Sequence, residues 1–334
     1  MHSRIQFPRE EETMGTASGK ANYKMDSGYI RRAKHAGSWY SSDRTELDGT
    51  LSSFLEEAAS ESSTEDLDTP LRAVICPHAG YSYSGLTAAY SYHHLRSELQ
   101  KVDSPIKRIL LLHPSHHVYL NGCAVSGASR IETPLGNLQI DEELRDEILN
   151  LNPRGFSIME KSVDELEHSG EMQYPYIAKA CGKKNIKVLP IMCGNISGRQ
   201  EEDYGRLLAP IVGRQDVLCV VSTDFCHWGS RFQYQPTPNT TSIEIHEHIR
   251  QLDARGIRHI CLQEPRAFAK YLTETRNTIC GRHAISVWLN AVHCNKPEQE
   301  VLDIQFVKYA QSSQVRAMRE SSVSYGSATA RRKI

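Results

Sequence analysis

The amino-acid sequence predicts an α/β protein whose central sheet is covered by helices on both faces. Short apolar runs alternate along the chain with longer stretches of helical periodicity, as expected for buried strands separated by helices. Buried strands separated by helices suggest a sheet that is covered on both faces. Ligands of such sheets gather beyond the carboxyl ends of the strands.

Five apolar runs are predicted to be strands, and eight periodic segments are predicted to be helices. The strands are residues 72–76, 108–112, 187–193, 217–222 and 302–309. The helices are residues 44–58, 84–99, 141–150, 171–181, 199–213, 242–253, 265–275 and 282–293. Pro77 and Pro114 fix the local backbone just after two of the strands and help to end them.

The chain is predicted to consist of a disordered extension followed by one domain. Residues 1–32 are polar and charge-mixed and show no apolar periodicity, which is typical of a disordered segment. The remaining residues, 33–334, contain no internal repeat, and the polar stretch at 58–70 is interpreted as a linker inside one α/β domain.

Composition and charge exclude several classes of function. A formal net charge of −1 gives no electrostatic reason to expect nucleic acid as a partner. No apolar run approaches the roughly 20 residues that span a bilayer, and the start of the chain lacks a secretory signal, so we expect no membrane insertion. The nine cysteines are scattered and never form a C-x-x-C pair, which predicts reduced thiols and a cytoplasmic, possibly nuclear, location. We expect no nucleotide cofactor.

Histidines follow three of the predicted strands within a few residues of their ends. The side chains concerned are His78, His116, His117 and His227, with Asp224 beside the last of them. Because the exits of parallel strands meet in one crevice, two of these imidazoles with a further N, O or S ligand would suit a divalent metal such as iron, zinc or copper. A side chain left uncoordinated could move protons. Alternatively, each histidine simply hydrogen-bonds its own loop.

Two further clusters carry candidate site residues. Cys280 directly precedes the helix predicted at 282–293, where exposed amides favour a thiolate that can bind metal or act as a nucleophile. Cys226 has the next most suggestive setting, although most buried cysteines serve only packing. His168 and Glu171 lie three residues apart and would face the same way on a helix. The alternative for this second cluster is a solvated helix start with an acidic first turn.

Eight short segments together resemble the MEMO family (mediator of ErbB2-driven cell motility), in the order found in that family. They are "HAGSWY" (35–40), "PHAGYSYSG" (77–85), "PSHHVYL" (114–120), "TPLG" (133–136), "EHSGEMQYPY" (167–176), "STDFCHWG" (222–229), "NTICGRH" (277–283) and "YAQSSQ…SSVSYGSA" (309–314 and 321–328). The resemblance covers almost everything from residue 33 onward.

The resemblance implies a three-layer α/β/α fold with a mostly parallel central sheet, similar to the class III extradiol dioxygenases. It also implies an iron or copper ion held by His78, His116 and Cys280, with Asp224 and His227 in acid/base or pocket roles. The remaining pocket and second-shell residues would be His117, His168, Glu171, Cys226, Trp39 and Tyr81.

The sequence departs from the family pattern at two positions near the site. Position 113 is His where relatives commonly have Gly, which adds an imidazole at a strand exit. Gly170 stands where an aliphatic residue is usual, so we expect a looser wall around His168.

Three functions fit this pattern. The resemblance implies a metal-binding signalling effector downstream of receptor tyrosine kinases, acting in cell motility, cytoskeletal organisation and redox regulation through reactive oxygen species. Its partners would be phosphotyrosine-containing receptors or adaptors and proteins of small GTPase or NADPH oxidase pathways. The second function is a metal-dependent oxidoreductase, although Cys280 in place of the usual carboxylate argues against ordinary dioxygenase turnover. The third is a copper- or iron-sequestering protein.

Overall fold

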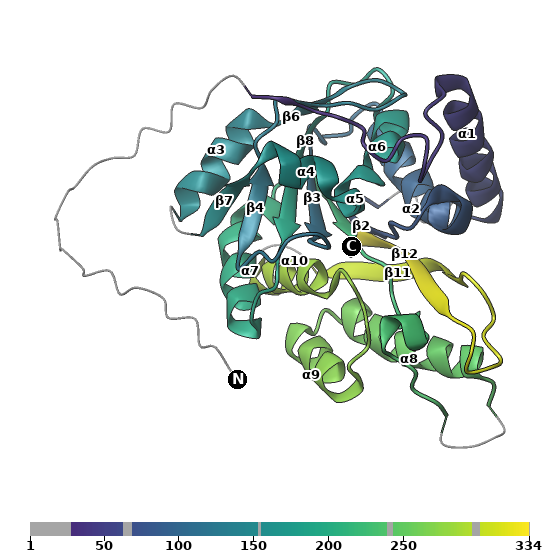
Figure 1. Cartoon of the computed structure of the whole chain (residues 1–334). Coiled ribbons are helices and arrows are strands. Elements are labelled where there is room, and N and C mark those ends of the chain that lie inside the picture. Colours follow the sequence, from purple (N-terminus) through teal and green to yellow (C-terminus); the bar gives the residue numbers. More distant parts are fainter. Residues whose placement is uncertain (1–27, 63–68, 153–154, 239–242, 296–300, 334) are drawn as a thin grey trace, which may run out of the picture.

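The structure, a computed structural model, places a large mixed sheet at the centre of the molecule with helices on both sides (Figure 1). It describes residues 28–62, 69–152, 155–238, 243–295 and 301–333. The predicted α/β/α class is confirmed.

The strands and helices have the following bounds. The strands are β1 (Ile30–Arg31), β2 (Leu71–Cys76), β3 (Arg108–Pro114), β4 (Cys123–Ser126), β5 (Arg130–Ile131), β6 (Leu138–Ile140), β7 (Phe156–Met159), β8 (Lys187–Cys193), β9 (Val217–Ser222), β10 (His227–Trp228), β11 (Leu302–Gln311) and β12 (Ser322–Arg332). The helices are α1 (Arg44–Glu61), α2 (Tyr81–Gln100), α3 (Glu142–Leu151), α4 (Lys161–Leu166), α5 (His168–Glu171), α6 (Tyr174–Cys181), α7 (Gly198–Val212), α8 (Ile245–Cys261), α9 (Pro265–Thr275) and α10 (Arg282–Asn295).

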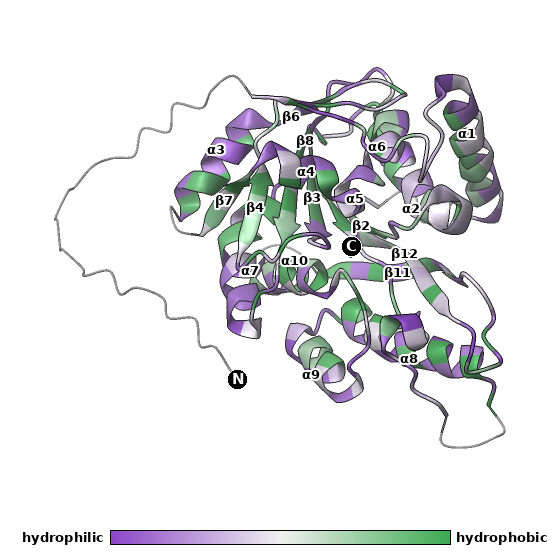
Figure 2. Cartoon of the chain, viewed as in Figure 1, coloured by the Kyte–Doolittle hydropathy of each residue, from purple (hydrophilic) through white to green (hydrophobic). Residues whose placement is uncertain are grey.

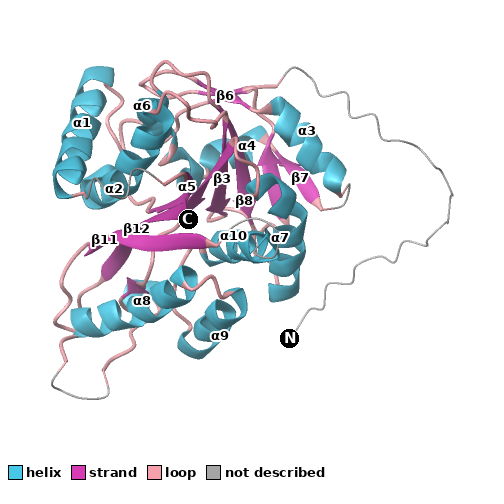
Figure 3. Cartoon of the chain, turned by 180° about the vertical axis from the view of Figure 1, so that it is seen from behind, coloured by secondary structure: helices cyan, strands magenta, loops and turns pink. Residues whose placement is uncertain are grey.

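Four neighbouring parallel strands form the middle of the sheet, in the order β8-β3-β9-β2. Antiparallel strands extend this centre: β12 pairs with β2, β10 and β11, and β4 pairs with β8 (Figure 3). The chain therefore combines a parallel core with an antiparallel flank, and the carboxyl ends of β3, β9 and β2 lie side by side.

Helices shield both faces of this sheet from water. Helix α2 packs on β2 and β12 and is backed by α1 and α6, whereas α7 and α10 pack together against β9. Every residue of β2 and β9 is buried, and the hydropathy colouring shows the strands at the centre as apolar (Figure 2). Two-sided burial explains why these strands appear in the sequence as continuous apolar runs.

The five strands and the helices predicted from periodicity are present, with one correction. The helix predicted at 171–181 is two helices, α5 and α6, because Pro175 in the first turn of α6 favours a new helix start there. Strands β1, β4–β7, β10 and β12 were not predicted. Most are very short, and β12 is built of small and polar residues that become buried only between β2 and β11.

The folded part of the chain begins earlier than the sequence predicted. Arg31, assigned to the disordered extension, lies in β1, which pairs with β5, and its side chain is completely buried. Its guanidinium forms ion pairs with Asp164 (3.0 Å) and Glu171 (2.7 Å). Ile30 and Arg31 thus belong to the sheet, and residues 1–27 of the predicted extension lie outside the described residues.

Among the helices in the described parts of the chain, none combines the length and apolarity needed to cross a bilayer.

Replacing Arg31 by Met should destabilise the protein strongly, because two buried carboxylates lose their cation. We expect a loss of about 3–5 kcal/mol in the free energy of unfolding, measured by urea denaturation. The neighbouring Arg32→Met variant is the control, since Arg32 forms only an exposed ion pair with Glu132 and should lose about 1 kcal/mol or less. Equal losses in the two variants would contradict the role given to Arg31.

Candidate metal centre

Three adjacent strands each place a polar side chain two residues beyond their carboxyl end. His78 follows β2, His116 follows β3 and Asp224 follows β9, the strand between them. The imidazole rings of His78 and His116 lie 5.2 Å apart between centroids, with an angle of 77° between their planes. The convergence predicted from the strand exits is therefore present in the structure.

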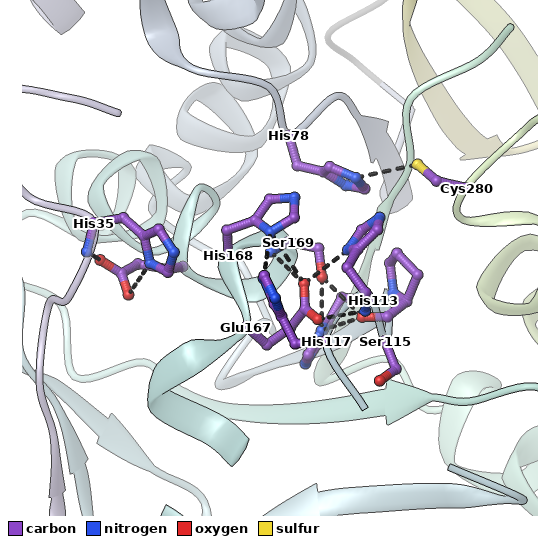
Figure 4. Close-up of polar contacts among 12 residues, drawn as sticks. His35, His78, His113, Ser115, His117, Glu167, His168, Ser169 and Cys280 are labelled. Carbon is purple, nitrogen blue, oxygen red and sulfur yellow. Dashed lines mark hydrogen bonds and ion pairs between the residues drawn. The ribbon is translucent and has the colours of Figure 1, made fainter. Parts of the chain in front are cut away.

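The hydrogen bonds of His78 fix which ring nitrogen carries the proton. Its Nδ1 lies 2.8 Å from the hydroxyl of Ser222, whose own proton is donated to the carbonyl oxygen of Ser169. His78 Nδ1 must then be the donor to Ser222, which leaves a lone pair on Nε2. Nε2 lies 3.1 Å from Sγ of Cys280 (Figure 4). Burial lowers the pKa of His78 well below its ordinary value, so the ring stays neutral.

A buried carboxylate orients His116. Nδ1 of His116 lies 2.8 Å from Glu167, and the His116 backbone N–H donates to the other oxygen of the same carboxylate. Burial works against the charged carboxylate, but His116 and His168 hold the pKa of Glu167 well below its usual range. A carboxylate on Nδ1 is the usual support of a metal-binding histidine, and it leaves Nε2 for the ion.

Burial opposes the charged form of His116, but its neighbours favour it. The hydrogen bonds and charges of Cys280 and Glu167 outweigh the burial and raise the pKa of His116 to about 10. A metal ion that binds here would therefore displace a proton from the ring.

The turn that carries Cys280 is pressed against β9. The Cys280 sulfur accepts the backbone N–H of Asp224 at 3.2 Å, and the Gly281 N–H donates to the hydroxyl of Thr223. A Cβ on Gly281 would lie 2.4 Å from Cβ of Thr223, so only glycine allows this close approach. Helix α10 starts at the next residue, as the sequence predicted.

Two sets of three potential ligands share His78, and each has its ligand atoms within 4.8 Å of one another. One set adds His116 and His168, and the other adds Asp224 and Cys280. The His168 ring stacks on His116, with centroids 4.4 Å apart and an angle of 28° between the planes. Because imidazole lone pairs lie in the ring plane, two stacked rings cannot both point at one ion. Neither set combines His78, His116 and Cys280, but His116 and Cys280 each lie beside His78, and His168 packs against His116.

Aromatic rings close one side of the crevice. Trp39 lies against the other side of His168 at 4.5 Å, and His117 Nε2 lies 3.4 Å from His168 Nδ1. Burial and the charge of His116 lower the pKa of His168 to about 3, which keeps this wall neutral. Trp39 and His117 therefore both lie beside His168.

His227 and Asp224 supply protonatable groups beside the candidate ligands. Nδ1 of His227 faces two carbonyl oxygens, those of Phe225 (2.9 Å) and Thr278 (3.0 Å). Carbonyls only accept, so Nδ1 carries the proton and Nε2 is a free base, and burial lowers the pKa of the ring. Burial raises the pKa of Asp224 to about 7 although it accepts the His78 N–H. Asp224 is therefore suited to proton transfer near neutral pH, and His227 offers an unprotonated Nε2 beside it.

Three of the residues expected to line the pocket or to support it lie behind the crevice in the structure. The Tyr81 hydroxyl donates to the carbonyl of Met172 inside the core, and the side chain of Cys226 is completely buried among apolar residues. Glu171 is also completely buried and, contrary to the shared face expected, its carboxylate binds Arg31 rather than lining the crevice with His168. These three residues are close to site residues in the sequence, but their side chains point into the core that supports the site.

Sequence reasoning did not assign site roles to Glu167, Ser222 and Thr278. Each fixes a histidine: Glu167 orients His116, Ser222 sets the tautomer of His78, and Thr278 holds the loop that carries His227. Glu167 directly precedes His168, and Ser222 directly precedes Thr223 and Asp224, so both residues lie within the motifs. Their contacts with histidines from distant parts of the chain could not be predicted from those motifs.

The two departures from the family pattern fit each other in space. A Cβ on Gly170 would lie 3.2 Å from Nε2 of His113 and 2.9 Å from the hydroxyl of Tyr174. The His113 ring is buried, with Nδ1 3.0 Å from the Ser169 hydroxyl. The space beside Gly170 is thus filled by His113, and the looser wall expected around His168 is not present.

We expect Gly170→Ala to destabilise the protein by about 1–3 kcal/mol, because the new methyl group would lie 2.9 Å from the Tyr174 hydroxyl and 3.2 Å from the His113 ring. The same substitution made together with His113→Gly should cost less than the sum of the two single changes, a coupling measured by a double-mutant cycle in urea. Additive losses would show that the two positions do not compensate for each other.

The fold and the crevice together define an α/β/α protein with potential metal ligands gathered around His78, beside the carboxyl ends of its central parallel strands. The family model described as Memo-like protein matches residues 31–329. The chain belongs to this family, which confirms the resemblance seen in its motifs.

Individual relatives match over most of their length. Protein MEMO1 of Homo sapiens is 40% identical over 298 residues, covering 88% of this chain and 95% of that protein. Protein MEMO1 of Danio rerio is 41% identical over the same length. Protein memo-1 homolog of Caenorhabditis elegans is 40% identical over 300 residues, 90% of this chain and 82% of the relative. A solved structure of an uncharacterized Escherichia coli K12 protein overlaps 75% of this chain at a TM-score of 0.47 and 13% identity.

Proposed function

We propose that the chain binds an iron or copper ion through His78, His116 and Cys280. The main support for this proposal is that the unprotonated Nε2 of His78 lies 3.1 Å from the Cys280 sulfur. The ring of His116 lies beside that of His78, at an angle of 77°. Two imidazoles and a thiolate are a donor set suited to iron, copper or zinc, and the thiolate favours copper over hard cations.

A bound iron or copper ion would supply one-electron redox chemistry at the crevice. The surrounding residues have separate tasks that the geometry supports. Glu167 holds His116 in orientation, Asp224 and His227 hold protons beside the ligands, and Trp39 with His168 covers one side.

At the level of the cell, we propose a metal-dependent signalling effector in the cytoplasm and nucleus, acting downstream of receptor tyrosine kinases on motility, the cytoskeleton and reactive oxygen species. Membership of the Memo-like family supports this part. Phosphotyrosine-containing receptors or adaptors are the proposed partners, with proteins of small GTPase or NADPH oxidase pathways further downstream.

A second candidate is a metal-dependent oxidoreductase. The specific observation in its favour is His227, whose proton is fixed on Nδ1 by two carbonyls and whose Nε2 is left as a base. Oxygen consumption by the iron-loaded protein with catechols, abolished in His227→Phe, would support this function. Titration with a phosphotyrosine peptide that persists after metal removal would support the effector instead.

The ligand set can be tested with Co²⁺ as a spectroscopic probe of metal binding under anaerobic, reducing conditions. We expect the wild-type protein to show sulfur-to-cobalt charge-transfer absorption, which Cys280→Ser should lose together with at least about tenfold in affinity. The matched control is Cys294→Ser, because Cys294 is an exposed cysteine at the opposite end of α10 from Cys280 and should leave both readouts unchanged. His168→Phe should keep the absorption band.

Persistence of the band in Cys280→Ser would overturn the His-His-Cys set. Loss of binding in His168→Phe with a normal thermal transition would instead favour the three-histidine set.

A further inference from the structure

A pair of buried cysteines lies at the end of the loop that carries His116. Cys123 is the first residue of β4 and Cys193 the last residue of β8. The two are directly opposite each other in the antiparallel β4–β8 pairing, and each is about 1% exposed. Neither belongs to the candidate metal centre, and both are free thiols.

The hydrogen bonds around the pair identify the kind of position it occupies. The Gly194 N–H donates to the Gly122 carbonyl at 2.9 Å, and the Cys123 N–H donates to the hydroxyl of Tyr204 instead of to Cys193. This is the pattern of a non-hydrogen-bonded pair, in which the two Cα atoms are about 4.5 Å apart. That separation lies within the range of about 4.4–6.8 Å found for disulfides.

The register places the two side chains next to each other. Because Cys123 and Cys193 are directly opposite in the β4–β8 pairing, both side chains point to the same side of the sheet. Formation of a bond between the sulfurs would therefore need little movement of the strands.

Cys193 also lies beside both ends of the segment 115–122. It pairs with Pro114, the last residue of β3, on one side and with Cys123, the first residue of β4, on the other. The segment between these two residues carries His116 and His117 and leads directly into the candidate site. A covalent link between Cys123 and Cys193 would fix the far end of this segment to the central sheet.

We propose that Cys123 and Cys193 form a cross-strand disulfide when the protein meets a hydroperoxide, and that this disulfide restrains segment 115–122. In the first step one cysteine sulfur attacks the O–O bond, which breaks to give a sulfenic acid and an alcohol or water. In the second step the other sulfur displaces the hydroxyl group, forming the S–S bond and releasing water. The two thiols lose two electrons and two protons in total, and the peroxide accepts them.

The setting of the pair makes this reaction slow but its product stable. Burial and the neighbouring thiol raise the pKa of Cys123 well above its ordinary value, so little thiolate is present and the peroxide must enter through a local opening of the strand ends. Once formed, the bond is held by a sheet that keeps the two sulfurs adjacent, which disfavours reduction. We therefore expect the disulfide to form during prolonged exposure to peroxide and not during brief exposure.

Peptide mapping of the folded, full-length protein tests the bond itself. The protein is exposed to hydrogen peroxide until the exposed Cys294 is fully oxidised and then for a prolonged period, and free thiols are alkylated after unfolding. Trypsin should then release residues 109–130 linked to residues 188–199, a product sensitive to reductant. Cys123→Ser and Cys193→Ser should abolish it. Cys76 and Cys219, equally buried in β2 and β9, should stay alkylatable.

Two results would overturn the disulfide: both cysteines remaining free after the prolonged exposure, or either one linking to a different cysteine in the folded protein. Hydrogen exchange tests the consequence for the loop. Amides of segment 115–122 should exchange more slowly in the oxidised than in the reduced protein, and oxidation of Cys193→Ser should cause no slowing. Equal exchange in the oxidised and reduced wild type would overturn the restraint. Neither readout requires a bound metal, so the outcome is independent of the Co²⁺ experiment.

Discussion

The buried guanidinium of Arg31 is the interaction on which one whole side of the crevice depends. It lies between the carboxylates of Asp164 and Glu171, all three side chains being almost or completely inaccessible. It also donates to the main-chain carbonyl of Glu167, and so joins β1 to the segment that orients His116 and supplies His168. Each of these charges would be costly alone in a dry interior, and the cost is offset only because they meet in one place.

The same cluster extends to the aromatic cover of the site. Glu171 accepts the backbone N–H of His35 and the hydroxyl of Tyr40, which fixes the loop between them. Trp39 belongs to this loop, and its ring packs against that of His168. One electrostatic cluster around Arg31 therefore positions Trp39, His168 and Glu167. The three proposed ligands are positioned separately, by strands of the sheet and the start of α10.

The sequence predicted the core strands and most helices because their signals are local. Apolar runs and helical periodicity mark β2, β3, β8 and β9 without reference to the rest of the chain. The strand β12 and the residue Arg31 carry no such signal, since polar residues become buried there only through partners elsewhere. For Arg31 those partners lie 133 and 140 residues away.

The site shows the same division between local and distant information. The resemblance implied His78, His116 and Cys280 as neighbours, and in the structure His116 and Cys280 each lie beside His78. Proximity in sequence could not decide whether Cys226 and Tyr81 line the crevice or support it, because adjacent residues at a strand exit or helix start point in different directions. The protonation of each imidazole also depends on distant hydroxyl and carbonyl groups, which no spacing rule identifies.

The separation of 202 residues between His78 and Cys280 has a further consequence. A ligand held by both residues contacts opposite ends of the folded chain, so no fragment ending between them contains the complete set. Such a ligand binds the native state and not the unfolded chain, and mass action then adds its binding free energy to the stability of the whole sheet. Only the completely folded chain would bind such a ligand. The fraction of folded protein, and with it the resistance to degradation, would therefore rise with the concentration of the ligand.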